Sequence, residues 1–375
     1  MIIAFDAKRA FFNNTGLGNY SRNTLNQLFQ YFPQHQYQLY STVAKPRIKF
    51  NIPSNVRVVT PDTFTGKLFK SYWRSLLINN QLIRNKPDIY HGLSNELPFG
   101  ITSTKVKTVV TIHDLIFKRY PQWYKSHDVK IYDKKFSYAA KYADAIVAVS
   151  KQTANDIVEW YHVSPEKIKV VYQSCNPVFF NLLSQETIEH IKEKEKIPAS
   201  YLLYVGTIEE RKNLHTLVEA LAISKTDIPL VVVGRKTNYY FKKVEPLIQK
   251  YQLSKQIYFI ENIDNKELPG IYQGAKIFIY PSLYEGFGIP VLESLASGTP
   301  VITTAGGCFN ESGGKYSVFV DSKNPDALAH SIYDLIDNKE KRITMIEEGR
   351  KYARLFNAQS SAENLMNLYE QLLSI

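Results

Sequence analysis

The sequence predicts an α/β fold built from two doubly wound domains, each with a parallel sheet covered by helices. Short apolar runs rich in Val, Ile, Phe and Tyr alternate with amphipathic helical segments along the chain, which is typical of such sheets. The chain of 375 residues is too long for one ordinary core and suits two domains of about 150–200 residues. A charged stretch at residues 181–199 separates two alternating halves and is predicted to be the linker between them.

The first half, residues 1–180, opens directly on a strand. A glycine-containing loop and an amphipathic helix follow at residues 15–32. The strands predicted for this half are residues 2–7, 36–42, 56–60, 88–93, 107–115, 144–150 and 167–175.

The second half, residues 200–355, repeats the alternation of strands and helices. The tail, residues 356–375, is predicted to be a helix, because Ser360 is followed three residues later by Glu363 in a capping-box pattern. The strands predicted for the second half are residues 201–207, 229–234, 257–262, 277–281, 300–304 and 316–320.

Composition excludes several classes of protein. Hydrophobic residues make up 44% of the chain, and Gly and Pro number only 17 each, which is typical of a globular protein. No apolar run reaches the roughly 18 residues that a membrane span needs, and the N-terminus lacks the layout of a signal peptide. The two cysteines, Cys175 and Cys308, lie far apart, which suits a reducing compartment. We therefore expect a cytoplasmic protein.

Positive charge is concentrated in the first half. Residues 1–180 carry 24 Lys and Arg against 11 Asp and Glu, a net charge of +13, whereas the remainder is close to neutral at −2. A basic half indicates an anionic partner, either a membrane surface or nucleic acid, or else a generally basic and soluble surface. Nucleic acid is disfavoured because no recognised binding module accompanies the charge.

Residues 64–78, FTGKLFKSYWRSLLI, interleave Lys and Arg with large apolar side chains. One interpretation is an interfacial helix that docks on anionic lipid. The other, which the sequence favours, is an amphipathic helix that packs its aromatic side chains inward. Together with the charge of the first half, the segment predicts reversible, peripheral attachment to the inner face of the cytoplasmic membrane.

The most informative motif is YEGFGIPVLESLASG at residues 284–298. It places two carboxylates, Glu285 and Glu293, around a glycine-rich turn that leads into a helix. Pro290 suits the first helical turn and Gly298 the C-terminal cap. The free N–H groups at the helix start favour phosphate, whereas the carboxylates suit hydroxyl groups, so the motif predicts a site for a sugar nucleotide.

This motif resembles the Glu-x7-Glu signature of the retaining glycosyltransferases of family 4, and residues 296–307, ASGTPVITTAGG, continue the same pattern. The resemblance implies the GT-B fold, with two Rossmann-like domains facing across a cleft and a C-terminal helix, residues 356–375, that crosses back to the first domain. It also implies that Glu285 contacts the donor sugar and Glu293 the nucleotide ribose. The resemblance further implies that the backbone of the turn binds the donor through Gly286, Phe287, Gly288 and Ile289.

A second matching stretch, VGTIEERKNL at residues 205–214, follows the first strand of the second half. Gly206 permits a turn, and Arg211 and Lys212 resemble the family's phosphate-binding cations. Their charges would stabilise the departing nucleoside diphosphate electrostatically. Many relatives carry an arginine directly after this glycine, where the present chain has Thr207.

In the first half, His113 stands at the end of the apolar strand KTVVTI. A buried histidine satisfied by the backbone is the commoner meaning of such a residue, but His113 matches the family's active-site histidine. The resemblance implies a sugar-orienting and charge-stabilising role. Gly16, Leu17 and Gly18 resemble the family's glycine loop near the donor diphosphate, although Ser21 leaves only half of a dinucleotide fingerprint.

The chain has no Asp-x-Asp, HExxH or CxxC pattern, so no metal site and no cofactor besides the nucleotide-sugar donor is expected. Residues 5–21 and 91–98 resemble bacterial mannosyltransferase-like members of the family, and residues 90–98 resemble their acceptor-side loop. We therefore expect a retaining, metal-independent transfer of a hexose to a polysaccharide or a lipid-linked oligosaccharide. Mannose from GDP-mannose is favoured, with a UDP-sugar donor or a GT-B sugar-nucleotide epimerase as alternatives.

Overall fold

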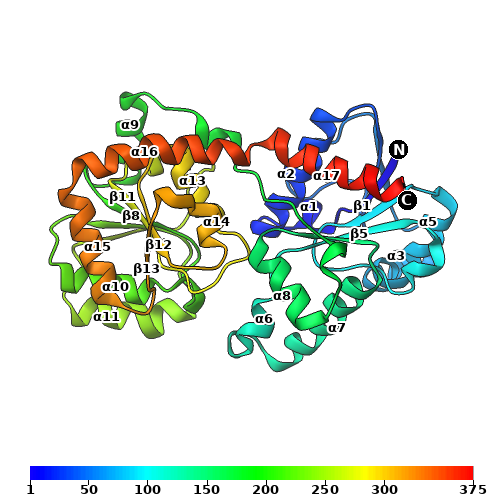
Figure 1. Ribbon diagram of the computed structural model, residues 1–375, viewed down its shortest axis with the longest axis horizontal. Coiled ribbons are helices and arrows are strands. Elements are labelled where there is room, and N and C mark those ends of the chain that lie inside the picture. Colours follow the sequence, from blue (N-terminus) through cyan, green and yellow to red (C-terminus); the bar gives the residue numbers. More distant parts are fainter. Residues whose placement is uncertain (375) are drawn as a thin grey trace. The chain divides into compact units, whose positions relative to one another are not determined.

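A computed structural model of the chain describes residues 1–374 (Figure 1). It divides into two compact units. Unit 1 comprises Met1–Ser174 together with the C-terminal segment from Ala358, and unit 2 comprises Cys175–Asn357. Each unit contains its own parallel sheet, as an α/β fold with two doubly wound domains requires.

The sheet of unit 1 has seven strands in the order β3-β2-β1-β4-β5-β6-β7, and every neighbouring pair is parallel. Each strand lies within one of the predicted runs. The order of the strands reverses between β1 and β4, which makes this position the topological switch point of the sheet. The strands are β1 Ile2–Asp6, β2 Gln36–Tyr40, β3 Val56–Val59, β4 Ile89–Gly92, β5 Lys107–Ile112, β6 Ala145–Ala148 and β7 Ile168–Val170.

Helices cover both faces of this sheet because successive side chains of a strand point to opposite sides. Ile3 and Phe5 of β1 belong to a core that α2 and α17 cover, whereas Ala4 belongs to a second core with α5 and α7. The α-helices of unit 1 are α1 Lys8–Phe12, α2 Gly16–Tyr31, α3 Phe64–Leu68, α4 Lys70–Tyr72, α5 Ile78–Asn85, α6 Ile116–Arg119, α7 Ser126–Tyr142, α8 Lys151–Tyr161 and α17 Ala358–Leu373. Shorter helices are the π-helix η1 Trp73–Leu77 and the 3₁₀-helices η2 Ile101–Thr104, η3 Pro121–Trp123 and η4 Pro165–Lys167.

The C-terminal helix α17 packs against α2 (Figure 1), so the tail of the chain belongs to unit 1. Its start differs from the prediction. The helix begins at Ala358, two residues before Ser360, so Ser360 does not cap it and the predicted capping box is wrong. Glu363 instead accepts a hydrogen bond of 2.8 Å from Nε2 of Gln359, one turn earlier.

The sheet of unit 2 has six parallel strands in the order β10-β9-β8-β11-β12-β13, and its switch point lies between β8 and β11. All six lie within predicted runs. They are β8 Leu202–Val205, β9 Leu230–Val233, β10 Ile257–Ile260, β11 Ile277–Tyr280, β12 Val301–Thr304 and β13 Val318–Val320.

The α-helices of unit 2 are α9 Gln185–Glu195, α10 Leu214–Ser224, α11 Glu245–Lys250, α12 Leu268–Gly274, α13 Ile289–Ser297, α14 Phe309–Gly313, α15 Pro325–Asp337 and α16 Lys339–Ala353. Shorter helices are η5 Pro177–Phe180, η6 Glu210–Lys212, the π-helix η7 Tyr240–Val244, η8 Gly314–Tyr316 and η9 Arg354–Phe356.

The stretch predicted as a linker, residues 181–199, is instead part of unit 2. Ser184 caps α9 by accepting a hydrogen bond from the N–H of Thr187. Ile188 and Ile191, one turn apart, are buried against α12, whose glycines let the two helices approach closely. The charged residues on the other side of α9 made the segment look like a linker. The chain passes between the units after Ser174 and again after Asn357.

Candidate active site

The glycine-rich turn of unit 2 has the geometry that the motif predicts. It follows β11 and ends at Gly288, whose φ of 94° favours glycine and caps the start of α13. A Cβ atom at Gly288 would also lie 2.9 Å from Oγ of Ser312. Pro290 stands in the first turn of α13, and Gly298, with a φ of 79°, ends the helix. The turn and the start of α13 therefore form at the C-terminal edge of the sheet, beside its switch point.

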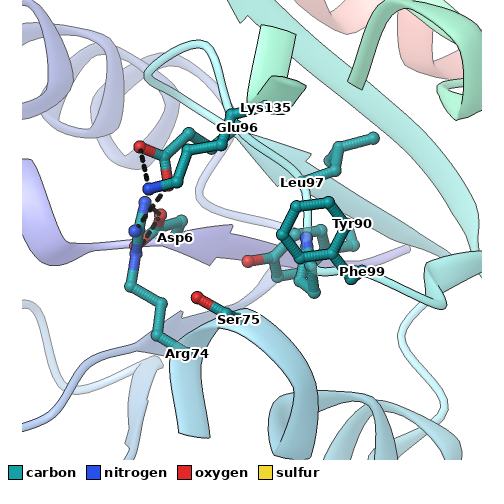
Figure 2. Close-up of a pocket in the computed structure, with 9 residues that line it drawn as sticks. Asp6, Arg74, Ser75, Tyr90, Glu96, Leu97, Phe99 and Lys135 are labelled. Atoms are coloured by element: carbon teal, nitrogen blue, oxygen red, sulfur yellow. Dashed lines mark hydrogen bonds and ion pairs between the residues drawn. The ribbon is translucent and has the colours of Figure 1, made fainter. Parts of the chain in front are cut away.

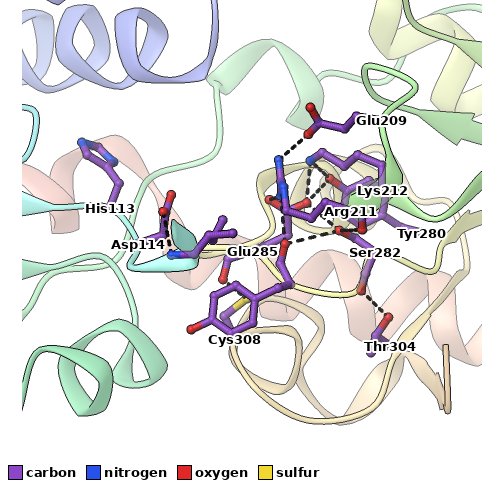
Figure 3. A network of polar contacts seen from close by, with 12 residues as sticks. His113, Asp114, Glu209, Arg211, Lys212, Tyr280, Ser282, Glu285, Thr304 and Cys308 are labelled. Atoms are coloured by element: carbon purple, nitrogen blue, oxygen red, sulfur yellow. Dashed lines mark hydrogen bonds and ion pairs between the residues drawn. The ribbon is translucent and has the colours of Figure 1, made fainter. Parts of the chain in front are cut away.

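Glu285 is the centre of a buried polar network in this turn (Figure 3). Its Oε2 lies 2.6 Å from Nη1 of Arg211, and its Oε1 lies 2.5 Å from Nζ of Lys212. The hydroxyls of Tyr280 and Ser282 each donate a hydrogen bond of 2.8 Å to the same Oε1. Burial alone would raise the pKa of Glu285, but the two cations and these hydrogen bonds lower it to about 2. The carboxylate is therefore ionised and fixed in orientation.

The two cations come from the turn after β8, on the other side of the switch point. Gly206 ends that strand with a φ of 154°, and η6 then carries Arg211 and Lys212. Arg211 is held further by Oε1 of Glu209 at 2.7 Å and by the carbonyl of Tyr284 at 2.8 Å. Arg211 and Lys212 therefore lie in contact with Glu285, a contact that the two sequence motifs taken separately did not reveal.

Glu293 occupies a different environment on α13. The hydroxyl of Tyr272 donates a hydrogen bond of 3.2 Å to its Oε2. Burial raises the pKa of Glu293 to about 7, and the hydrogen bond from Tyr272 only partly opposes this. The environments of the two glutamates therefore shift their pKa values in opposite directions, because cations surround Glu285 whereas burial dominates at Glu293.

His113 lies in unit 1, at the end of β5, and is 5% exposed. Its Nε2 lies 2.9 Å from the carbonyl oxygen of Leu93. Since a carbonyl can only accept a hydrogen bond, Nε2 is the protonated nitrogen, and the lone pair of the neutral ring is on Nδ1. The edge of the neighbouring ring of Tyr20 meets the imidazole at a centroid distance of 4.5 Å. Burial lowers the pKa of His113 to about 4, which leaves the ring uncharged at neutral pH. The sugar-orienting and charge-stabilising role that the resemblance implies for His113 remains a prediction.

The glycine loop is part of a helix rather than a loop. Helix α2 starts at Gly16, so Gly16, Leu17 and Gly18 form its first turn. Gly18 is buried, and a Cβ atom there would lie only 1.8 Å from the carbonyl oxygen of Asn13. Gly16 is exposed and has open space around it. Close packing therefore explains Gly18 without a ligand, whereas Gly16 leaves room for one.

The segment at residues 64–78 contradicts the favoured interpretation. Trp73 is buried and donates from Nε1 to Oε1 of Gln81 at 3.1 Å. Ile78, at the end of the segment, is also buried, whereas four large apolar side chains before Trp73 point to solvent. Their exposed fractions are 81% for Phe64, 62% for Leu68, 59% for Phe69 and 52% for Tyr72. We call these four residues the apolar patch. Three short helices, α3, α4 and η1, replace the single amphipathic helix that the sequence suggested.

Sequence analysis missed three members of the Glu285 network: Tyr280, Ser282 and Glu209. A signal for the first was present, because Tyr280 is a hydroxyl-bearing residue at the end of the apolar strand KIFIY. Among residues 1–374, no cluster of three or more His, Cys, Asp or Glu is arranged to hold a metal ion. Within the same residues no helix is long and apolar enough to cross a bilayer.

Two Rossmann-like sheets, the second with a carboxylate, an arginine and a lysine at its switch point, define the GT-B class of glycosyltransferase fold. A sucrose-phosphate synthase from Thermosynechococcus elongatus has the same fold, with a TM-score of 0.79 at 19% identity over 100% of this chain and 99% of that one. Residues 185–352 match the family described as glycosyl transferases group 1, and residues 15–177 match glycosyltransferase family 4. The chain belongs to these glycosyltransferases and is an enzyme, which disfavours the epimerase alternative.

Two bacterial relatives are similar in sequence. O-antigen chain mannosyltransferase B from Escherichia coli is 25% identical over 292 residues, which is 76% of this chain and 75% of the relative. O-antigen chain mannosyltransferase RfbU from Salmonella typhimurium is 30% identical over 203 residues, which is 54% of this chain and 53% of the relative.

Proposed function

We propose that this enzyme transfers a hexose from a nucleotide sugar to a glycan, with mannose from GDP-mannose as the favoured donor. The similarity to two O-antigen mannosyltransferases supports mannose and a growing surface polysaccharide or lipid-linked oligosaccharide as the acceptor. A UDP-sugar is the alternative donor. Retention of the anomeric configuration is part of the proposal, and it rests on the resemblance of residues 284–298 to the retaining family.

The observation that carries the proposal is the contact of Glu285 with both Arg211 and Lys212. In the reaction, the oxygen of an acceptor hydroxyl bonds to the anomeric carbon while the bond from that carbon to the diphosphate oxygen breaks, and the hydroxyl proton passes to the released diphosphate. The nucleoside diphosphate leaves with negative charge, which a buried guanidinium and ammonium stabilise without donating a proton themselves. These two cations would take the place of a metal ion, so we propose that no metal is required.

Glu285 has a second part in this scheme. In the donor-free protein its carboxylate neutralises the cations that the diphosphate would bind. When the diphosphate takes over Arg211 and Lys212, the carboxylate is released toward the donor sugar, where it can accept hydrogen bonds from hydroxyls. The N-terminus of α13 adds free N–H groups at the same turn.

We further propose that the enzyme works in the cytoplasm and attaches reversibly to the inner face of the cytoplasmic membrane. The apolar patch and the exposed Lys67 and Lys70 beside it support this location. Residues 63–76 contain no Asp or Glu, so the patch would not repel an anionic lipid surface. Apolar side chains of this size add burial in the interface to the electrostatic attraction.

The donor can be identified with the purified protein. Thermal shifts with GDP, UDP and ADP test the base, since a ligand that binds only the folded state raises the melting temperature by mass action. We expect GDP to stabilise most, and incubation with GDP-mannose to release GDP. Stabilisation by UDP alone would replace GDP-mannose with a UDP-sugar. No stabilisation by any diphosphate would overturn the proposed function.

A further inference from the structure

A series of hydrogen-bonded side chains crosses the core of unit 1, and nothing in the scheme above uses it. It begins on the C-terminal helix α17, where the hydroxyl of Tyr369 lies 2.6 Å from Nδ1 of His91 on β4. Nε2 of His91 lies 2.9 Å from Oγ1 of Thr111 on β5. That oxygen lies 3.1 Å from the hydroxyl of Tyr20 on α2. We call these four residues the Tyr369 network.

The Tyr369 network lies in the core that α2 and α17 cover. Tyr369, His91 and Thr111 are each 0% exposed, and Tyr20 is half-buried. The ring of Phe5 packs on His91 at a centroid distance of 5.9 Å. Burial lowers the pKa of His91 to about 3, so its ring is neutral at neutral pH. A neutral imidazole donates from one nitrogen and accepts at the other, and His91 therefore joins the two hydroxyls beside it with both nitrogens paired.

The last member of the network contacts His113. The rings of Tyr20 and His113 are perpendicular to each other, with centroids 4.5 Å apart. The imidazole of His113 is held on another side by the carbonyl of Leu93, 2.9 Å from Nε2. The ring of Tyr20 therefore limits where the imidazole can turn, and the hydroxyl of Tyr20 is the end of that ring which the network fixes.

A second polar cluster of unit 1 provides a contrast (Figure 2). Arg74 lies 2.5 Å from Asp6 and 2.8 Å from Glu96, and Lys135 lies 3.2 Å from Glu96. The charges of that cluster are paired with one another, as the cost of burying them requires, so ion pairing accounts for it. The Tyr369 network holds no charge to neutralise, and it leads from a helix to a residue of the predicted site.

We propose that Tyr369 is a positioning residue for His113: through His91 and Thr111, helix α17 fixes Tyr20, which holds the imidazole in the orientation used for transfer. Docking of α17 alone does not account for the network, because α17 and α2 already pack directly against each other. A buried polar group that loses its partner is costly, so loss of one member disturbs the next. The proposal deepens the proposed function and rests on it.

Nuclear magnetic resonance tests the positioning without any substrate. Histidine labelled with ¹³C at Cε1 gives one signal for each of the eight histidines of the full chain, and His113→Gln identifies that of His113. The ring current of Tyr20 acts on the imidazole at this short distance, so movement of the tyrosine ring shifts the signal. We expect Tyr369→Phe, which removes only a hydroxyl, to shift or broaden the signal of His113.

Kinetics tests whether the positioning serves the reaction. With donor saturating, Tyr369→Phe and Tyr20→Phe should each lower kcat about fivefold, the effect of one lost hydrogen bond, with little change in donor KM. Residues that act through one network are not additive, so the double variant should also lose about fivefold and not about 25-fold.

Tyr37→Phe is the matched control. Tyr37 is a buried tyrosine of the same core, and its hydroxyl bonds to the carbonyls of Leu28 and Phe32, outside the network. This variant should keep the wild-type kcat and the wild-type signal of His113, even where its melting temperature falls. Should Tyr369→Phe fail to fold, Thr111→Val interrupts the network at its middle with a side chain of the same shape, and the same signature is expected.

An unchanged His113 signal in Tyr369→Phe or in its substitute Thr111→Val would overturn the proposal, as would a shifted signal with wild-type kcat. Additive losses in the double variant, or equal losses in Tyr37→Phe, would overturn it as well, because the hydroxyls would then act separately or through stability. If the wild type turns over no nucleotide sugar, the proposed function fails, and the His113 signal still decides whether α17 positions the imidazole.

Discussion

Nη1 of Arg211 lies 2.6 Å from Oε2 of Glu285, so the cation proposed to bind the donor diphosphate and the carboxylate proposed to bind the donor sugar neutralise each other. The two residues are 74 positions apart in sequence and meet only because β8 and β11 are neighbours at the switch point. The ion pair keeps both side chains ordered and charged in a largely buried site. If the donor diphosphate binds these cations, as proposed, it competes with Glu285 for them.

Replacing Glu285 with Gln should separate binding from turnover. We expect turnover to fall about 100-fold or more, since one lost electrostatic interaction at the reacting sugar is worth roughly 3–4 kcal/mol. Diphosphate affinity should stay equal or become tighter, because the neutral amide no longer competes for Arg211 and Lys212. Calorimetry with GDP or UDP and a donor-turnover assay give the two values. Turnover close to that of the wild type would show that Glu285 is not in the active site.

Replacing Lys212 with Met should slow transfer even when donor is saturating, because the charge of the leaving diphosphate grows in the transition state. We expect a loss of turnover of about 100-fold. Lys255→Met, at an exposed lysine of the same unit, serves as the control and should behave as wild type. In the same assay the wild type should keep full activity in EDTA. Activity that EDTA abolishes and Mg²⁺ or Mn²⁺ restores would contradict a metal-independent reaction.

Tyr280 and Ser282 are expected to be positioning residues for Glu285. Each donates a hydrogen bond of 2.8 Å to Oε1. Tyr280→Phe and Ser282→Ala each remove one of these bonds, and we expect kcat to fall about tenfold with little change in donor KM. Unfolding curves check the alternative of a purely structural role. A lower melting temperature with unchanged kcat would assign the two hydroxyls to stability alone.

Glu293 predicts a dependence of stability on pH. The pKa of Glu293 is about 7 in the folded protein, whereas the ordinary value for a glutamate, which applies to the unfolded chain, is 4.5. As the pH rises, this carboxyl group therefore ionises at a lower pH in the unfolded chain than in the folded protein. The folded state therefore loses stability between about pH 4.5 and pH 7, by up to about 3 kcal/mol. Glu293→Gln removes this ionisation. We expect its melting temperature to exceed that of the wild type by more at pH 8 than at pH 5, and a constant difference would exclude a raised pKa.

The apolar patch predicts membrane binding that is more than electrostatic. Leu68→Ser with Phe69→Ser should weaken binding to anionic vesicles about tenfold or more, because burying such side chains is worth roughly 1.5–3 kcal/mol each. Tyr333→Ser, at an equally exposed aromatic side chain of unit 2, is the control. Co-sedimentation with anionic vesicles at low and high salt, and with neutral vesicles for comparison, separates the electrostatic contribution to binding from the apolar one. If the wild type ignores anionic vesicles at low salt, peripheral attachment is wrong.

The sequence by itself determined the fold class and the position of every strand in the two sheets. Alternation of apolar strands with amphipathic helices is a local pattern, and parallel strands that are buried on both faces leave a clear apolar run. The turn between β11 and α13 was equally readable, because Gly288, Pro290 and Gly298 each meet a conformational requirement at their own position. The motif also pointed to Glu285, Arg211 and Lys212, although not to the contacts among them.

Tertiary structure decided what each side chain touches. Residues 181–199 look like a linker by charge, yet the two isoleucines of α9 find a surface on α12 that no local pattern reveals. The sequence pattern predicted that the aromatic side chains of α3 and α4 pack into the core, but in the structure these side chains are exposed. The charge of His113 and of Glu293 depends on burial and on partners that are distant in sequence. Local sequence fixes backbone conformation, whereas burial and ionisation depend on which elements come together around a side chain.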